Sequence, residues 1–85
     1  MVVDFWAPWC APCRATGPIL EEVGRAQAGK ALLLKVNTDL NPQPSARLGI
    51  QAIPTFIVFK GGQEKARQSG ALPAPAMTQW VARNV

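Results

Sequence analysis

Two short apolar runs along the chain have the composition of buried strands. Residues 2–6 (VVDFW) are β-branched or aromatic apart from one aspartate, and residues 31–39 (ALLLKVNTD) open with a second such run. Between them, residues 11–28 space their apolar side chains for one buried face of a helix, with Pro18 expected to kink it and Gly29 to end it. The pattern therefore predicts two buried parallel strands joined by a crossover helix.

A short helix and a last, longer helix are predicted in the second half of the chain. Asn41 has the side chain of an N-cap residue, Pro42 fits the first helical position, and Gly49 fits the end of that helix. Residues 74–85 are amphipathic with a helical period. Their core-facing side chains are expected to be Met77, Trp80 and Val81.

Two adjacent glycines, Gly61 and Gly62, mark the turn of a predicted β-hairpin. Residues 54–60 and 63–69 flank this turn and are expected to pair antiparallel. The complete order is βαβαββα, so we predict an α/β fold with a central mixed four-stranded sheet flanked by helices. The chain has 85 residues, which is the length of one domain, covering 1–85.

The composition indicates a soluble globular protein. Hydrophobic residues make up 48% of the chain and charged residues 16%, and no apolar run approaches the roughly 20 residues that cross a bilayer. The first residues lack the pattern of a secretory signal, so the expected location is the cytoplasm. The net charge of +4 comes from lysines and arginines scattered singly, which is typical of a solvated surface and argues against a nucleic-acid partner.

The segment WAPWCAPCR, residues 6–14, holds both cysteines of the chain, Cys10 and Cys13. A zinc site needs four ligands and the chain has no histidine, so only a metal cluster shared between two chains would complete one. A disulfide between these cysteines closes so short a loop that it would stabilise the fold by roughly 2 kcal/mol before strain is subtracted. At a helix start after a strand, both sulfurs lie on one helix face, and Cys10 lies near free backbone N–H groups that stabilise a thiolate. The motif therefore favours disulfide exchange, with metal binding and inert thiols as the alternatives.

Four segments together resemble the thioredoxin family in order and spacing, over nearly the whole chain. They are VVDFWAPWCAPCR (2–14), KVNTDLNP (35–42), GIQAIPTFIVFKGG (49–62) and SGALP (69–73). The wording is most similar to the thioredoxin-2 branch of the family, whose N-terminal zinc module is absent from this sequence. The resemblance implies the thioredoxin fold in a minimal form, because the family's usual first strand and helix are also absent.

The resemblance implies a role for each residue of the cysteine motif. Cys10 would be the nucleophile and Cys13 the resolving thiol, while Trp9 and Pro12 would belong to the surface that contacts the substrate. The alternative for Trp9 is packing in the core. Thioredoxins usually have glycine where this chain has Ala11, so we expect a shifted redox potential with function retained.

Asp4 lies inside an apolar strand, where an unpaired buried carboxylate is costly and has a raised pKa. The resemblance implies that Asp4 is the buried acid behind Cys13 and accepts the proton of that thiol, with Lys35 on the neighbouring strand as its charge partner. The alternatives are an exposed acid at a strand end, and a lysine whose stem packs on the sheet while its ammonium reaches water.

Pro54 begins a predicted strand, where proline is tolerated for structural reasons alone. The resemblance implies instead a cis Ile53–Pro54 peptide bond that faces the cysteines. The backbone of Ile53 would pair with an extended substrate segment, while Ala52, Gly70 and Ala71 would complete a shallow apolar groove. Such β-augmentation depends little on the sequence of the substrate.

Residues 32–36 would lie at an edge of the sheet, because the family's first strand is absent. Their side chains are mostly apolar. This edge is therefore a candidate for pairing with another chain, including dimerisation.

We predict a protein disulfide reductase, which is a thiol–disulfide oxidoreductase that needs no bound cofactor and no metal. Cys10 would attack a disulfide in a client protein, Cys13 would resolve the mixed disulfide, and a reductase such as thioredoxin reductase would restore the dithiol. One alternative is a thiol oxidant or isomerase, although such relatives often have histidine inside the motif. Another is a binding module that keeps the fold and lacks turnover.

Overall fold

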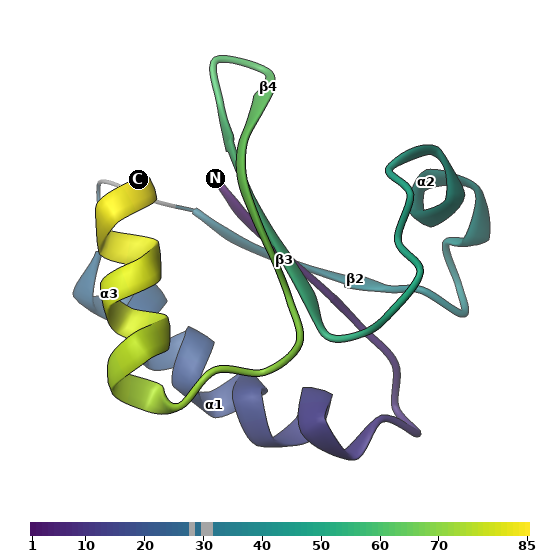
Figure 1. Ribbon diagram of the computed structural model, residues 1–85, viewed down its shortest axis with the longest axis horizontal. Helices are drawn as coiled ribbons and strands as arrows, with labels where there is room; N and C mark the ends of the chain where they lie inside the picture. Colours follow the sequence, from purple (N-terminus) through teal and green to yellow (C-terminus); the bar gives the residue numbers. More distant parts are fainter. Residues whose placement is uncertain (28, 30–31) are drawn as a thin grey trace.

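The chain forms a four-stranded mixed sheet with helices on both faces (Figure 1). A computed structural model describes residues 1–27, 29 and 32–85. The predicted βαβαββα order is confirmed, whereas the predicted limits at Ala28 and Ala31 lie outside the described residues. The elements are β1 (Val2–Trp6), α1 (Ala11–Ala26), β2 (Leu33–Asn37), α2 (Pro42–Arg47), β3 (Thr55–Lys60), β4 (Gln63–Ser69) and α3 (Ala74–Asn84).

The sheet has the strand order β2-β1-β3-β4. β1 and β2 are parallel and are joined by α1, as predicted, whereas β1 and β3 are antiparallel. β3 and β4 form the predicted hairpin through Gly61 and Gly62, whose φ angles of 61° and 79° lie in the left-handed region that favours glycine. β1, which leads directly into the cysteine motif, is therefore a central strand that is held on both sides.

One face of the sheet carries α1 and α3, which contact each other (Figure 1). The core between them and the sheet includes the predicted Met77, Trp80 and Val81 of α3. A fully buried side chain of this size contributes about 1.5 to 3 kcal/mol relative to an exposed one, so this layer fixes α1 against β1. The other members of this core are Val2, Leu20, Val23, Phe56 and Val58.

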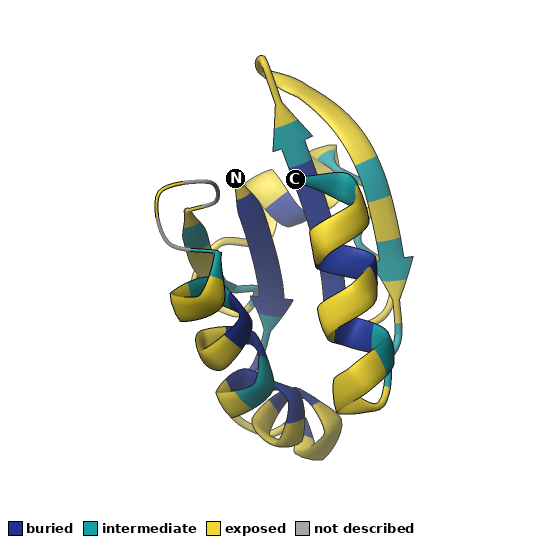
Figure 2. Ribbon diagram, turned by 90° about the vertical axis from the view of Figure 1, so that its left-hand side faces the viewer, coloured by how far each residue is buried: buried dark blue, intermediate teal, exposed yellow. Residues whose placement is uncertain are grey.

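The opposite face of the sheet carries α2. Val3, Phe5 and Ile57 are buried there, with Leu48 and Ile50 from the segment after α2 packed against them. Figure 2 shows the buried residues gathered on β1 and on the inward faces of the helices, whereas the outward faces of the helices are exposed. None of the helices in the described ranges is long and apolar enough to span a membrane.

The prediction that the second strand is buried is wrong. β2 lies at the end of the sheet, so it has a strand neighbour on one side, and Leu34 is 44% exposed. The edge position that the resemblance implied for residues 32–36 is confirmed by the strand order. Leu32, which precedes β2, is 63% exposed.

The helix limits differ slightly from the predicted ones. α1 ends at Ala26, ahead of the predicted stop at Gly29. Asn41 is the N-cap residue of α2, but its side chain does not cap the helix, because its Nδ2 donates to the Asn37 carbonyl at 3.0 Å. Gly49 has φ of 69° directly after the C-cap residue of α2, where glycine was predicted.

Candidate active site

Cys10 is the N-cap residue of α1, directly after the turn that leaves β1. Its backbone N–H donates to the Ala7 carbonyl at 3.1 Å, and its carbonyl accepts from Arg14 N at 3.2 Å. The first N–H groups of a helix have no partner inside the helix. Here the Cys13 N–H donates to Cys10 Sγ at 3.3 Å, while Pro12, in the first turn, has no N–H to satisfy. The sulfur of Cys10 therefore occupies the position of a capping oxygen.

Cys10 and Cys13 are joined by a disulfide across one turn of α1, with their Cα atoms 5.3 Å apart. Both are buried, and they pack with Ala7 against Trp6 and Ile53. In this oxidised state the exposed fractions of the two residues are nearly equal, 5% for Cys10 and 3% for Cys13. The geometry therefore places a disulfide, whose reduction takes two electrons, at a helix start.

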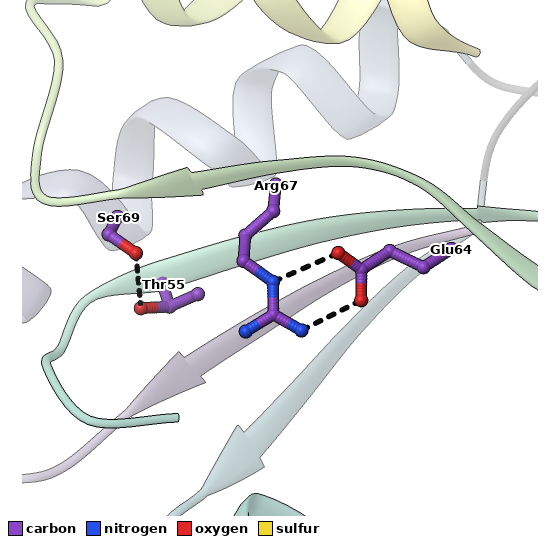
Figure 3. A network of polar contacts seen from close by, with 4 residues as sticks. All are labelled: Thr55, Glu64, Arg67 and Ser69. Carbon is purple, nitrogen blue, oxygen red and sulfur yellow. Dashed lines mark hydrogen bonds and ion pairs between the residues drawn. The ribbon is translucent and has the colours of Figure 1, made fainter. Parts of the chain in front are cut away.

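The loop before β3 brings Ile53 to the cysteines. The Ile53–Pro54 peptide bond is cis, and the Ile53 carbonyl oxygen lies 3.8 Å from Cys10 Sγ. Thr55 Oγ1 donates to the Ala52 carbonyl at 2.6 Å and lies 3.4 Å from Ser69 Oγ (Figure 3). These bonds tie the loop to the β3–β4 hairpin, which thereby positions Ile53 beside the disulfide.

The same hairpin carries the remaining predicted groove residues. Gly70 N donates to the Pro54 carbonyl at 2.8 Å, and Ala71 next to it is exposed. Further along the hairpin, Arg67 and Glu64 form an ion pair with an N–O distance of 2.7 Å, also drawn in Figure 3. This pair lowers the pKa of Glu64 by hydrogen bonding from the guanidinium.

Trp9 is 68% exposed, so the alternative that it packs in the core is wrong. Its Nε1 donates to Asp39 Oδ2 at 3.0 Å, which tilts the indole toward the loop after β2. A groove with a volume of about 180 Å³ lies beside Trp9. Its lining consists of Trp9, Thr38, Ser45, Ile50, Gln51, Ala52 and Ile53.

The groove is composed differently from the predicted one. Trp9, Ala52 and Ile53 line it as predicted, whereas Gly70 and Ala71 are not among its lining residues. The sequence reasoning missed Thr38 and its neighbour Asp39. One available signal was their place just after β2, because the carboxyl ends of parallel strands meet at one edge of a sheet. Thr38 N indeed donates to the Trp6 carbonyl at 2.9 Å.

Asp4 is 1% exposed, so the alternative of an exposed strand-end acid is wrong. Its two carboxylate oxygens are buried and have no hydrogen-bond partner within the part of the chain that the structure describes. Burial raises the pKa of Asp4 to about 6, and the charge of Lys35 offsets part of that rise. Asp4 therefore changes protonation close to neutral pH.

Lys35 lies directly across from Asp4 in the β1–β2 register, but its ammonium contacts other side chains. Lys35 Nζ is 3.9 Å from Glu21 Oε1 and 5.1 Å from the centroid of the Trp6 ring. The side chain is 40% exposed, as expected for a lysine that reaches water. Asp4 and Lys35 therefore interact through space and do not form an ion pair.

The described residues contain no cluster of three or more histidine, cysteine, aspartate or glutamate side chains that could hold a metal ion. The site contains the two sulfurs of the Cys10–Cys13 disulfide and the groove that Trp9 and Ile53 line beside them.

Comparison with known proteins decides the family. The thioredoxin family model matches residues 1–83. The chain is 44% identical over its whole length to thioredoxin 1 of a Nostoc species and covers 79% of that protein. The chain belongs to the thioredoxin family. Thioredoxin of Rhodospirillum rubrum is 46% identical over 98% of the chain, which covers 80% of that relative.

A chloroplastic M-type thioredoxin of Zea mays is 43% identical over 95% of the chain, which covers 48% of that longer protein. As a thioredoxin with a Cys10–Cys13 pair, this protein is a thiol–disulfide oxidoreductase that reduces protein disulfides by dithiol–disulfide exchange. Its assignment to the thioredoxin-2 branch stays a prediction.

The thioredoxin should show a pH-dependent stability that Asp4 causes. Because its folded pKa of about 6 lies above the unfolded value of 3.8, its stabilising contribution is fully present below pH 3.8 and is lost as the pH rises through 6. The loss amounts to about 3 kcal/mol, since one pKa unit corresponds to about 1.4 kcal/mol. Replacing Asp4 with asparagine removes this dependence.

Urea denaturation of the oxidised protein at several pH values measures the effect. We expect the free energy of unfolding of Asp4→Asn to rise relative to that of wild type between pH 3.8 and pH 6. Parallel curves for the two proteins over this range would show that Asp4 titrates normally in the folded state.

Proposed function

We propose that Cys10 is the nucleophile and Cys13 the resolving thiol of the exchange reaction. The Cys10 thiolate attacks one sulfur of a client disulfide, forms a mixed disulfide and releases the other client sulfur as a thiolate. Cys13 then gives up its proton and attacks Cys10 Sγ, which closes the Cys10–Cys13 disulfide and releases the second client thiolate. Two electrons pass to the client, and its two sulfurs take up protons.

The observation that carries this order is the N-cap position of Cys10. A thiolate there accepts the Cys13 N–H and faces the positive end of the 16-residue α1 dipole. Both effects favour the charged form and lower the pKa of a thiol. Cys13, one turn further into the helix, has no such position.

Asp4 is proposed as the acceptor of the Cys13 proton. Asp4 shares one face of β1 with Val2 and Trp6, because successive side chains of a strand point to opposite faces. Val2 packs with Leu20 of α1 and Trp6 packs with the cysteines, so this face points to α1. An acid with a pKa of about 6 takes up and releases a proton near neutral pH. Lys35 is proposed to tune this affinity through its charge.

The groove is proposed to bind an extended segment of the client beside Ile53. Trp9, Pro12 and Ala52 are exposed, and Trp9 and Ala52 line the groove together with Ile53. Gly70 and Ala71 extend this surface past Pro54. Pairing with the backbone would suit many client sequences, as disulfide exchange with varied proteins requires.

The proposed partners are client proteins that contain disulfides, and a thioredoxin reductase that restores the dithiol in the cytoplasm. The motif agrees with the reducing direction, because it holds Pro12 between the cysteines and no histidine. A thiol oxidant or isomerase and a binding module without turnover are the alternatives, and the following experiment separates the binding module from the two kinds of catalyst.

Reduction of insulin by dithiothreitol tests the function and the order of attack together. Wild type should accelerate the reaction with or without a metal chelator, and both Cys10→Ser and Cys13→Ser should lose turnover. When each variant is first reduced and then mixed with insulin in the absence of dithiothreitol, Cys13→Ser should accumulate mixed disulfides with insulin, because no resolving thiol is left, whereas Cys10→Ser should not. A wild type that does not accelerate the reaction would indicate a binding module, and equal trapping by the two variants would contradict the assigned roles.

The free edge of β2 is proposed to pair with a second copy of this chain. Val2 N donates to the Leu32 carbonyl at 2.8 Å and Thr38 N to the Trp6 carbonyl at 2.9 Å, so the even-numbered residues of this segment bond to β1. In a parallel ladder the alternate residues point their N–H and C=O groups the other way. The backbones of Leu33, Lys35 and Asn37 therefore face outward.

The side chains favour one antiparallel register for two copies related by a two-fold axis. Centring the pair on Leu34 places Leu34 against its own copy and Leu32 against Val36. Centring it on Lys35 would set two ammonium groups opposite each other, which is unfavourable. A continuous sheet across two copies would cover the apolar edge.

Sedimentation velocity tests the pairing. Wild type should form dimers as the protein concentration rises, whereas Leu34→Lys should stay monomeric because it sets like charges at the centre of the interface. Leu40→Lys is the matched control, since Leu40 is 78% exposed and lies outside β2. A monomeric wild type, or a Leu34→Lys variant that dimerises like the control, would rule out this edge as the interface.

A further inference from the structure

Two carboxylates lie near the ammonium of Lys35. One is Asp4, whose Cα is paired with that of Lys35 across β1 and β2. The other is Glu21 on α1, whose Oε1 is 3.9 Å from Lys35 Nζ. The side chains of Glu21 and Lys35 are 53% and 40% exposed, whereas Asp4 is buried. The cation is therefore shared unequally, with the nearer carboxylate at the surface.

The surface of α1 supports this placement of the ammonium. A Cβ atom at Gly17 would lie 3.6 Å from Lys35 Nζ, so the ammonium rests against the helix at that glycine. Glu21 is four residues after Gly17 and thus lies on the same helix face, one turn further along. The Trp6 ring, 5.1 Å from Nζ, holds the cation from the sheet side.

The position of the Lys35 ammonium leaves the buried Asp4 carboxylate without an ion-pair partner in the part of the chain that the structure describes. Both oxygens of Asp4 lack a hydrogen-bond partner among the described residues, although a cation lies on the adjacent strand. An ammonium that moved inward would gain attraction to Asp4 and would lose its hydration and its contact with Glu21. The attraction of Glu21 therefore adds to the hydration that keeps the Lys35 ammonium at the surface.

We propose that Glu21 is a positioning residue for disulfide exchange: its carboxylate holds the Lys35 ammonium at the surface, over Gly17, and so keeps it away from the buried Asp4 carboxylate. This extends the proposed role of Asp4 as the proton acceptor for Cys13 and rests on it for its effect on the reaction. Without Glu21, the ammonium approaches Asp4 and stabilises the ionised form.

Few other charges face Asp4. β2 contributes Lys35, which acts on Asp4 through its charge and contacts Glu21 of α1. The buried Cys13 of α1 becomes ionisable in the dithiol state. The strand on the other side, β3, has no ionisable side chain from Thr55 to Phe59. The side chains of α3 that enter this core are Met77, Trp80 and Val81, which do not ionise. The charge that acts on Asp4 therefore depends on how strongly Glu21 holds the Lys35 ammonium.

An NMR titration of the Asp4 carboxyl carbon in the oxidised protein tests the proposal directly. The disulfide state removes thiol titration from the measurement. Glu21→Gln should lower the pKa of Asp4, with proton affinity falling about two- to fourfold, the size of an exposed ion-pair interaction. Glu22→Gln is the matched control, because it removes the same charge from the next, exposed position of α1 and should cause a much smaller shift.

A second background separates the mechanism from a direct effect of charge. In Lys35→Met, Glu21→Gln should leave the titration of Asp4 unchanged, because no ammonium is left to move. Three results would overturn the proposal. They are an equal shift of the Asp4 pKa by Glu21→Gln in both backgrounds, no shift by Glu21→Gln in the protein that keeps Lys35, and a shift by Glu22→Gln as large as that by Glu21→Gln.

The pH profile of single-turnover disulfide reduction then distinguishes this inference from the proposed function. If Glu21→Gln lowers the pKa of Asp4 and the rate profile moves to lower pH with it, both assignments are supported. If the titration moves and the rate profile does not, Glu21 positions Lys35 as inferred, while the role of Asp4 in the exchange is wrong.

Discussion

The hydrogen bond from the Cys13 N–H to Cys10 Sγ, at 3.3 Å, is the interaction on which the active site depends. It exists because only four residues, 7–10, separate the end of β1 from the start of α1, and this turn leaves Cys10 at the N-cap. A sulfur in this position accepts a hydrogen bond from a backbone N–H that has no partner inside the helix. The helix itself already holds this N–H in place. Packing of Leu20 and Val23 against the sheet holds the helix, and with it the two sulfurs, in place.

The same helix organises the charges behind the sulfurs. Its first turn carries the redox pair, its middle carries Gly17 beside the Lys35 ammonium, and its next turn carries Glu21. Asp4 lies beneath this face on a central strand, and its carboxylate, with a pKa of about 6, has no hydrogen-bond partner among the described residues. A buried acid of this kind reduces stability at neutral pH, so its presence in an otherwise apolar strand fits a function in proton transfer.

Much of the fold could be predicted from the sequence because its signals are local. The glycine pair at 61–62 specifies a hairpin turn, and the helical period of residues 74–85 identifies Met77, Trp80 and Val81 as core residues. The burial of β2 was mispredicted, because an apolar run does not reveal whether its strand has one neighbour or two. The exposure of Leu34 follows from strand order, which is a property of the whole sheet.

The site could be predicted only in part, for the same reason. The cysteine spacing and Pro54 are visible in the sequence, whereas the bond from Trp9 to Asp39 joins residues far apart in the chain. The resemblance correctly brought Lys35 next to Asp4 in register but did not reveal that its ammonium turns toward Glu21. Long side chains choose between partners by hydration and local sterics, which the sequence pattern does not encode.

The central claim is that the helix start makes Cys10 the reactive thiolate. The most direct measurement is the alkylation rate of each cysteine in the reduced protein as a function of pH, resolved by peptide mass spectrometry. We expect Cys10 to react faster than Cys13 at neutral pH, with a midpoint well below the value of about 8.5 for an ordinary cysteine. Faster labelling of Cys13, or an ordinary midpoint for Cys10, would show that the helix start does not activate Cys10.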